Sequence, residues 1–193
     1  QADVWEAFAA AALRKKQPAL AADAFRRSAA LDPLRTRVVI AAVALQAKIA
    51  SRQVTLDMLL ERLRAGETDP ALALAAARLL AARDRHAEAL PHAAAAVAAW
   101  TAANPGRSRP PGFWLFQGSL LERAGRLDEA ERLFREALAQ HPAHAPMLNY
   151  LAYMLAEQNR LLDEAEQLVR AALAAEPENS AYLDTLGWIF FQQ

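Results

Sequence analysis

The chain has 193 residues, 54% of them hydrophobic, so it is long enough for one sizeable domain or a short array of small units. Its 22 Lys and Arg residues are balanced by 22 Asp and Glu residues, which excludes the basic surplus that nucleic-acid binding requires. The absence of cysteine excludes disulfides, thiolate metal sites and cysteine nucleophiles, and no apolar run is long enough to span a membrane. Ala, Leu, Arg and Glu dominate, and these helix-forming residues predict an all-α fold.

The first predicted element is a helix–turn–helix unit over residues 5–33. Its most distinctive residues are, in chain order, Trp5, Ala21, Phe25 and Pro33. The same four residue types recur at the same spacing further along the chain as Trp114, Ala130, Phe134 and Pro142. Four matches of four residue types at fixed spacing indicate an internal repeat.

The next two predicted units are degenerate. Residues 38–70 keep the length of a helix–turn–helix unit but lose most of its repeated residues, and residues 72–97 have Ala93 at the place of Phe134. The segment NPGRSRPPG follows at 104–112, and its Pro and Gly residues forbid a continuous helix. We therefore expect three parts: N-terminal repeats over 1–104, a loop over 105–112, and C-terminal repeats over 113–193.

The C-terminal part holds two clear units, residues 114–142 and 148–177. In the first, Gly118 and Ala130 are small where two helices must approach closely, and Gly125 permits the positive φ that ends a helix. Pro142 ends the second helix of that unit, because the residue before a proline avoids the α region. We expect helix breaks near residue 33 and within 67–70, 104–112, 142–144 and 177–179.

A half-unit, SAYLDTLGWIFFQQ, occupies residues 180–193. Its packing positions carry Leu183, Leu186, Gly187 and Phe190, but the second helix that should cover them is missing from this sequence. Exposed apolar side chains of this kind forfeit roughly 1.5–3 kcal/mol each. We therefore predict a homodimer in which two such half-units pair around a two-fold axis, with fraying of the last helix as the alternative.

The segment WLFQGSLLERAGRLDEAERLFREALAQHP, residues 114–142, resembles the tetratricopeptide repeat, a helix–turn–helix unit of about 34 residues. The resemblance implies a right-handed α-solenoid whose first helices line a concave groove that holds a protein or peptide partner. The positions that the family uses for binding correspond here to Leu115, Ser119, Glu122, Arg123, Asn149, Tyr153, Glu157, Asp184, Trp188 and Phe191. For Tyr153 and Trp188, packing between neighbouring helices is the alternative.

We expect no catalytic residue, metal or cofactor. Ser119 lies within a predicted helix and is followed by Leu120, unlike the nucleophile of a hydrolase on its strand-to-helix turn. His141 and His144 have no third ligand at a recognisable spacing. The acidic pairs in the repeats sit at helix starts, where the helix dipole explains them. Segment 104–112 lacks the Lys-Ser/Thr helix start of a phosphate-binding loop. The sequence therefore predicts a non-enzymatic binding scaffold.

Roughly the last quarter of the chain, residues 148–193, resembles proteobacterial tetratricopeptide proteins, several of them envelope lipoproteins. Some of those proteins bring substrates to a periplasmic processing protease, so the resemblance implies an adaptor in the cell envelope, with the cytoplasm as the alternative location. The chain begins with Gln1 rather than Met, and we expect a fragment or a mature product. Two other functions stay open: a structural or self-assembly module, and an accessory repeat domain of a larger enzyme.

Overall fold

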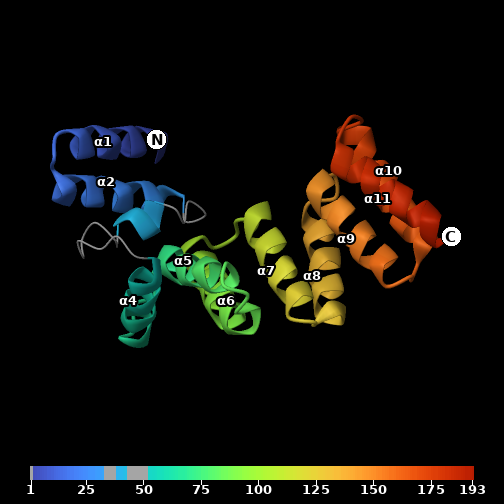
Figure 1. The fold of residues 1–193 in the computed structure, drawn as a ribbon, viewed down its shortest axis with the longest axis horizontal. Coiled ribbons are helices and arrows are strands. Elements are labelled where there is room, and N and C mark those ends of the chain that lie inside the picture. The colour runs from blue at the N-terminus through green and yellow to red at the C-terminus, as the bar shows by residue number, and fades with distance from the viewer. Residues whose placement is uncertain (1, 33–37, 43–51) are drawn as a thin grey trace. The chain divides into compact units, whose positions relative to one another are not determined.

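The computed structural model describes residues 2–32, 38–42 and 52–193, and every regular element in these ranges is a helix (Figure 1). The predicted all-α fold is confirmed. The chain divides into two compact units, which we call unit 1 (Gln1–Arg107) and unit 2 (Ser108–Gln193). The three parts expected from the sequence, with boundaries at residues 104 and 113, stay a prediction of how the repeats are grouped.

Unit 1 is built from helix pairs. Its helices are α1 (Ala2–Arg14), α2 (Pro18–Leu31), α4 (Arg52–Arg64), α5 (Pro70–Ala81) and α6 (His86–Ala103), and residues 38–42 are also helical. Short turns join α1 to α2 and α5 to α6, the two helices of each pair pack on each other, and α4 contacts α5. Each pair is a helix–turn–helix unit of the kind that the sequence predicts.

Small side chains form much of the core of unit 1. The residues that pack where α1 meets α2 are Ala9, Ala12, Ala21 and Ala24, with Trp5 and Phe25 against them. In α5, every residue from Ala71 to Ala77 is buried. Asp69 caps this helix by accepting a hydrogen bond from the backbone N–H of Ala71 at 2.8 Å. Because alanine loses no side-chain entropy in a helix and is small, these helices form readily and approach closely.

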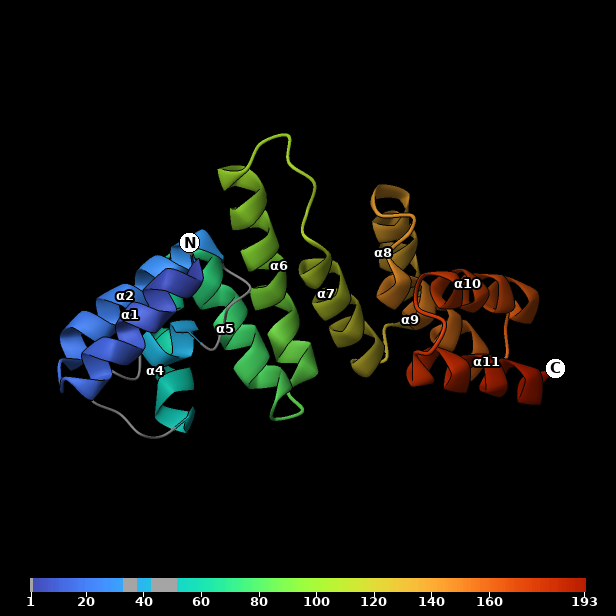
Figure 2. The same cartoon turned by 90° about the horizontal axis from the view of Figure 1, so that it is seen from above.

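Unit 2 has five helices: α7 (Pro111–Arg123), α8 (Leu127–Gln140), α9 (Ala145–Glu157), α10 (Leu162–Ala175) and α11 (Ser180–Gln192). α7 packs on α8 and α9 on α10, α8 also contacts α9, and α11 lies against α9 and α10 (Figure 2). Breaks between helices occur at all the segments predicted from residue 67 onward. The predicted break near residue 33 lies outside the described residues.

The repeated residues of unit 2 pack as the pattern predicts. Phe134 is fully buried, and a Cβ at Gly118 would overlap its ring. The ring of Tyr150 stacks on Phe134 with the centroids 4.8 Å apart. Gly125 has φ 74° in the turn after α7, a conformation that glycine adopts without strain. The predicted close approach at Gly118 and the predicted positive φ at Gly125 are confirmed.

α11 is buried along one side only. Tyr182, Thr185 and Ile189 are buried, whereas Leu183 and Phe190 are 50% and 49% exposed. The side chain of Asn179 caps the helix start by accepting a hydrogen bond from the backbone N–H of Ala181 at 3.1 Å. The side chains at these two packing positions are therefore uncovered in this structure, as expected for half of a repeat.

Candidate partner-binding surface

The predicted groove residues all lie on the first helices of their repeats, α7, α9 and α11, in unit 2. α9 lies against α11. It is tied to α7 by a hydrogen bond that the Tyr150 hydroxyl donates to Glu122 at 3.0 Å. The three helices therefore present neighbouring faces, and we call the ten predicted residues on them the helix-A surface.

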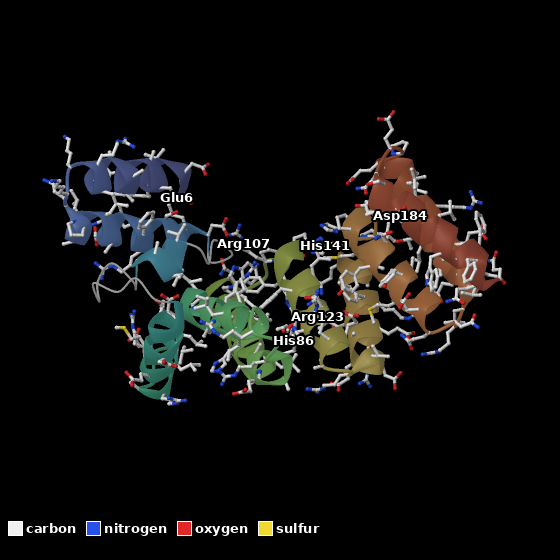
Figure 3. The ribbon with its side chains drawn as sticks, viewed as in Figure 1. Glu6, His86, Arg107, Arg123, His141 and Asp184 are labelled. Carbon is white, nitrogen blue, oxygen red and sulfur yellow. The ribbon has the colours of Figure 1, made fainter. Side chains whose placement is uncertain are left out.

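On α7, the side chains of the helix-A surface are only partly accessible to a partner. Leu115, Ser119 and Glu122 are half-buried. Arg123, at the end of the helix, is exposed (Figure 3). The Ser119 hydroxyl donates a hydrogen bond to the backbone oxygen of Phe116 at 2.8 Å, so it is engaged within its own helix. Ser119 thus lies in a helix, which argues against the nucleophile of a serine hydrolase.

Two tyrosines and two glutamates gather where α9 meets α7. Tyr153 is 41% exposed. Partial burial raises the pKa of its hydroxyl, and the carboxylates of Glu157 and Glu122 raise it further. Burial is also the main cause of the raised pKa of Tyr150, again with Glu122 beside it. Both phenols therefore stay protonated near neutral pH and can donate hydrogen bonds, which leaves the negative charge of this cluster on its carboxylates.

Asn149 is half-buried on the helix-A surface. Its side-chain oxygen is shielded from solvent and has no hydrogen-bond partner within the described part of the chain. A buried amide oxygen without a donor costs about 1–3 kcal/mol relative to a satisfied one. A partner that reorients this side chain and supplies an N–H group would recover that energy.

Aromatic rings form the α11 part of the helix-A surface. Trp188 is 36% exposed and Phe191 is 77% exposed, and the two rings stack with centroids 5.4 Å apart. Asp184 is exposed on the same helix (Figure 3). Because Tyr153 and Trp188 each keep more than a third of their surface in solvent, packing between helices does not fully account for either residue.

The two histidines of the HPAH segment have structural roles. His141 Nε2 donates to the backbone oxygen of Arg109 at 2.9 Å. His144 Nδ1 accepts from the backbone N–H of Met147 at 3.4 Å and so caps α9. Within residues 2–32, 38–42 and 52–193, no group of three or more His, Asp or Glu side chains is arranged to hold a metal ion. No helix in the same ranges is long and apolar enough to cross a membrane.

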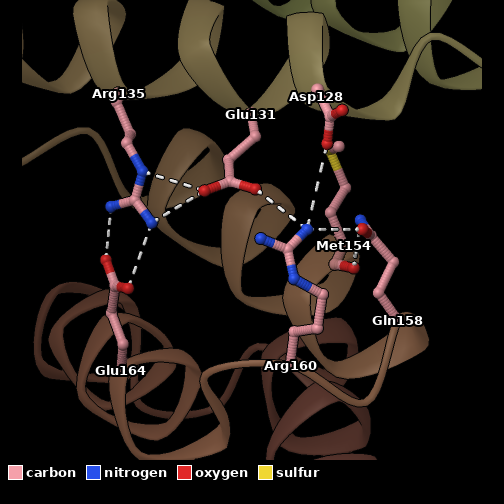
Figure 4. Close-up of polar contacts among 7 residues, drawn as sticks. All are labelled: Asp128, Glu131, Arg135, Met154, Gln158, Arg160 and Glu164. Carbon is pink, nitrogen blue, oxygen red and sulfur yellow. Dashed lines mark hydrogen bonds and ion pairs between the residues drawn. The ribbon is translucent and has the colours of Figure 1, made fainter.

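A polar cluster outside the helix-A surface joins the two complete repeats of unit 2 (Figure 4). Arg135 on α8 pairs with Glu164 on α10 at 2.5 Å and with Glu131 at 3.0 Å. Arg160, in the turn before α10, lies 3.6 Å from Glu131 and 4.0 Å from Asp128. The sequence did not predict this cluster, because the pairs that join the two repeats connect residues far apart in the chain. The segment DEAE, which recurs at 128–131 and 163–166, is the feature of the sequence that could have indicated it.

These features define a class: an all-helical repeat protein whose exposed aromatic and carboxylate side chains recur at the repeat spacing. A tetratricopeptide repeat family model matches residues 74–137 and 115–180, which together exceed half of the chain. The chain therefore belongs to the tetratricopeptide repeat family. Proteins with this fold are generally non-catalytic scaffolds for protein–protein interaction.

Solved structures of the same fold agree with this assignment. YrrB, described as a tetratricopeptide repeat protein with an unusual peptide-binding site, is 20% identical with a TM-score of 0.63, over 95% of this chain and 91% of its own. A thermophilic member from Thermus thermophilus is 17% identical with a TM-score of 0.59, over 99% of this chain and 100% of its own. MamA from Desulfovibrio magneticus is 15% identical with a TM-score of 0.57, over 92% and 97%. None of the curated proteins compared matches the chain.

Proposed function

We propose that the protein is a non-enzymatic scaffold that holds an extended segment of a partner protein on the helix-A surface of unit 2. The observation that carries this proposal is the recurrence of binding groups one repeat apart. Tyr153 and Trp188 occupy equivalent positions on α9 and α11, and Asn149 and Asp184 do so one turn earlier. Amide and carboxylate groups at this spacing match the repeating polar groups of a peptide backbone, and the rings beside them can stack on its side chains.

The charge of the helix-A surface favours a basic partner. The helix-A surface contains three carboxylates, those of Glu122, Glu157 and Asp184, and one cation, Arg123. The exposed rings of Tyr153 and Trp188 add π faces that attract Lys and Arg side chains, by about 0.5–2 kcal/mol per well-placed contact. Together these groups suit an extended segment with Lys or Arg residues, and they disfavour an acidic one.

The cell envelope is the cellular context that we propose, with the protein as an adaptor between a substrate and a processing enzyme. This finer proposal rests on the sequence resemblance of residues 148–193 to envelope tetratricopeptide proteins. Affinity capture from an envelope extract, with mass-spectrometric identification of what is retained, tests it. Retention of cytoplasmic proteins alone would contradict the envelope proposal and leave the scaffold proposal intact.

The binding proposal is tested with short labelled peptides in fluorescence anisotropy. We expect a lysine- and arginine-containing peptide to bind more tightly than the same peptide with Glu at those places. Tyr153→Ala and Trp188→Ala should each weaken that binding roughly tenfold, as is usual for aromatic residues central to an interface. Phe8→Ala supplies the control, because Phe8 is a similarly exposed aromatic residue in unit 1. Equal effects of all three changes would contradict the helix-A surface as the site.

A second function, self-association, is favoured by the exposed side of α11. Leu183 and Phe190 present apolar surface that a second copy could cover around a two-fold axis. Light scattering over a wide concentration range tests the homodimer. Leu183→Asp should abolish it without changing the helical content. A wild-type protein that stays monomeric at every concentration would refute the pairing.

A further inference from the structure

Unit 1 contains a groove that the helix-A surface does not include. It has a volume of about 870 Å³ and lies among α4, α5 and α6. Its walls are mainly apolar: Leu60 and Leu63 come from α4, Ala73 from α5, and a series of alanines from α6. A concave apolar site of this size falls in the range that accommodates ligands.

The repeat that forms one wall of the groove departs from the family pattern. The two family matches, 74–137 and 115–180, are offset so that Ala73 corresponds to Trp114 and Ala93 to Phe134. In unit 2, both aromatic side chains are fully buried. In unit 1, Ala93 is buried away from the groove, whereas Ala73 lines it. The small side chain of Ala73 therefore leaves this wall of the groove open to a side chain from another molecule.

The groove extends along one face of α6. His92, Ala95, Ala99 and Ala102 line it at intervals of three or four residues, which is the spacing of a single helix face. At about 1.5 Å per residue, the stretch from His92 to Ala103 is roughly 16 Å long, or three helical turns. α6 has 18 residues, whereas α2, α8 and α10 have 14 each, so the groove runs onto a part of α6 that these helices lack. Alanines along this face let a second helix approach closely.

One end of the groove is positively charged. Arg64 and His92 both line it. Arg64 is exposed and forms no ion pair with any described residue. Burial and then the charge of Arg64 lower the pKa of His92, so near neutral pH the lasting charge at this end is that of Arg64. Glu67 also lines the groove, but Arg62 neutralises it through two contacts of 2.7 Å. The unbalanced charge at this groove is therefore positive.

From the apolar walls, the length along α6 and the cation at one end, we infer that this groove binds an amphipathic helix of a partner protein that carries acidic residues beside its apolar face. The helix lays leucine-sized side chains between α4 and α6, as in other helix-in-groove complexes, and one carboxylate reaches Arg64. This site is separate from the helix-A surface, and its preferred charge is the opposite one.

The test uses the whole chain and two labelled peptides of about 16 residues, long enough to form a helix. Both have leucines on one face; one carries Glu beside that face and the other carries Lys. Fluorescence anisotropy should show saturable binding of the acidic peptide and binding roughly tenfold or more weaker for the lysine peptide. Arg64→Glu should reverse this preference. Absence of saturable acidic-peptide binding, or equal binding of both peptides by the wild type, overturns the inference.

A bulky residue in the groove provides the second readout. Ala99→Trp should weaken acidic-peptide binding roughly tenfold or more by filling the groove. Ala94→Trp is the matched control, because Ala94 is exposed on the same helix but does not line the groove. If Ala99→Trp loses helical content, Ala102→Trp, at an exposed groove position, replaces it. Equal weakening by the control change overturns the inference.

Two further experiments test whether the acidic peptide binds in unit 1 rather than on the helix-A surface, and whether a second copy of the chain fills the groove instead. Tyr153→Ala and Trp188→Ala lie in unit 2 and should leave acidic-peptide binding unchanged; a comparable loss in either overturns the assignment to unit 1. Sedimentation of the wild type and Ala99→Trp shows whether a second copy fills the groove. A wild-type dimer that becomes monomeric in Ala99→Trp would mean that it does, and the partner helix would be ruled out.

Discussion

The repeats of α5 and α6 in unit 1 and of α7 and α8 in unit 2 share one backbone plan but fill it differently. In the unit 2 repeat, Trp114 and Phe134 are buried between the helices, whereas Ala73 and Ala93 take those places in unit 1. Both pairs of helices form, because the small residues that allow close approach are kept in each. The difference shows that the signature aromatics are not needed for the helix–turn–helix path itself. In unit 2 the aromatic side chains fill the core, whereas in unit 1 Ala73 lines an open groove.

Ion pairs link the two complete repeats of unit 2. In the described part of unit 1, the salt bridges join residues two to five positions apart, such as Arg26 with Asp23. In unit 2, Arg135 and Arg160 also reach across from one repeat to the next. Nearest-neighbour interfaces carry much of the stability of repeat proteins. Unit 2 therefore has polar as well as apolar coupling between its repeats.

The largest test of this comparison removes the aromatic residue that fills unit 2. Phe134→Ala should lower the free energy of unfolding by about 3–5 kcal/mol, because Phe134 is fully buried and stacks on Tyr150. Phe25→Ala, at the equivalent place in the first repeat, should cost less, because Phe25 is only half-buried. Urea unfolding followed by circular dichroism measures both, and hydrogen exchange shows which unit opens. If both variants lost the same free energy of unfolding, the proposed difference between the two repeats would be wrong.

Two glycines at one position of the repeat should respond in opposite directions. Gly118→Ala should destabilise by about 1–3 kcal/mol, because its Cβ would overlap the ring of Phe134. Gly187 occupies the same position in α11, but a Cβ there meets nothing within 4 Å. Gly187→Ala should therefore stabilise by about 0.5–1 kcal/mol through helix propensity alone. Thermal unfolding of the two variants checks the signs; a destabilised Gly187→Ala would show that α11 is covered in solution.

The sequence predicted the helices and their breaks well because these depend on local chemistry. Pro, Gly and the period of the apolar residues can be read without knowing the partner helix, and the small side chains at Gly118 and Ala130 predicted a close helix approach. The exposure of Leu183 and Phe190 on α11 was also predictable from their positions in the repeat. These predictions required only the repeated residues and the helical spacing of the apolar ones.

The groove in unit 1 and the ion pairs between repeats were not predictable, because both depend on how residues far apart in the chain come together. Ala93 was noticed as a departure from the pattern, but a groove also needs Leu60 and Leu63 from another repeat. The pairing of Arg135 with Glu164 depends on how two repeats face each other. The shielded oxygen of Asn149 depends on how its side chain packs in the folded unit, which the repeat pattern does not specify. The role of the helix-A surface in binding stays a prediction.

A third test separates binding from stability on the helix-A surface. Asn149→Ala together with Asp184→Ala should weaken binding of the basic peptide without lowering the free energy of unfolding by more than about 0.5 kcal/mol. The exposed Asp184 makes little packing contribution, and removing the unpartnered oxygen of Asn149 costs no hydrogen bond. Parallel anisotropy and urea measurements check this. If the double variant unfolds as readily as Phe134→Ala, both residues belong to the core.

A smaller effect is expected for the coupling between repeats. Glu164→Gln should cost at most about 1 kcal/mol, because the pair with Arg135 is partly exposed. The hydrogen bond from Arg135 lowers the pKa of Glu164, so its contribution is present above the ordinary value near 4.5 and is lost as the pH falls through the lowered pKa. Asp163→Asn, a neighbouring exposed carboxylate, is the control. Urea titrations at low and high salt should show a salt-dependent loss for Glu164→Gln only.

The smallest expected effect is a pH dependence of the cap at the start of α9 in unit 2. His144 Nδ1 accepts a hydrogen bond at the start of α9, and burial followed by the nearby His141 lowers the pKa of His144 below the ordinary 6.5. The unfolded chain therefore takes up a proton first as the pH falls. The cap's contribution is complete above 6.5 and declines below it, since the protonated ring cannot accept the bond and its charge opposes the helix dipole.

His144→Asn isolates this effect, because asparagine is among the best N-caps and does not titrate. Between pH 7.5 and pH 5, the wild type should lose a few tenths to about 1 kcal/mol relative to the variant. His92 in unit 1 also has a lowered pKa, but it is present in both proteins, so its contribution cancels in the difference. Urea unfolding at the two pH values measures that difference directly. Parallel pH profiles for the two proteins would mean that the His144 cap contributes nothing, and the pH response of the fold would then have to be sought at His92 in unit 1.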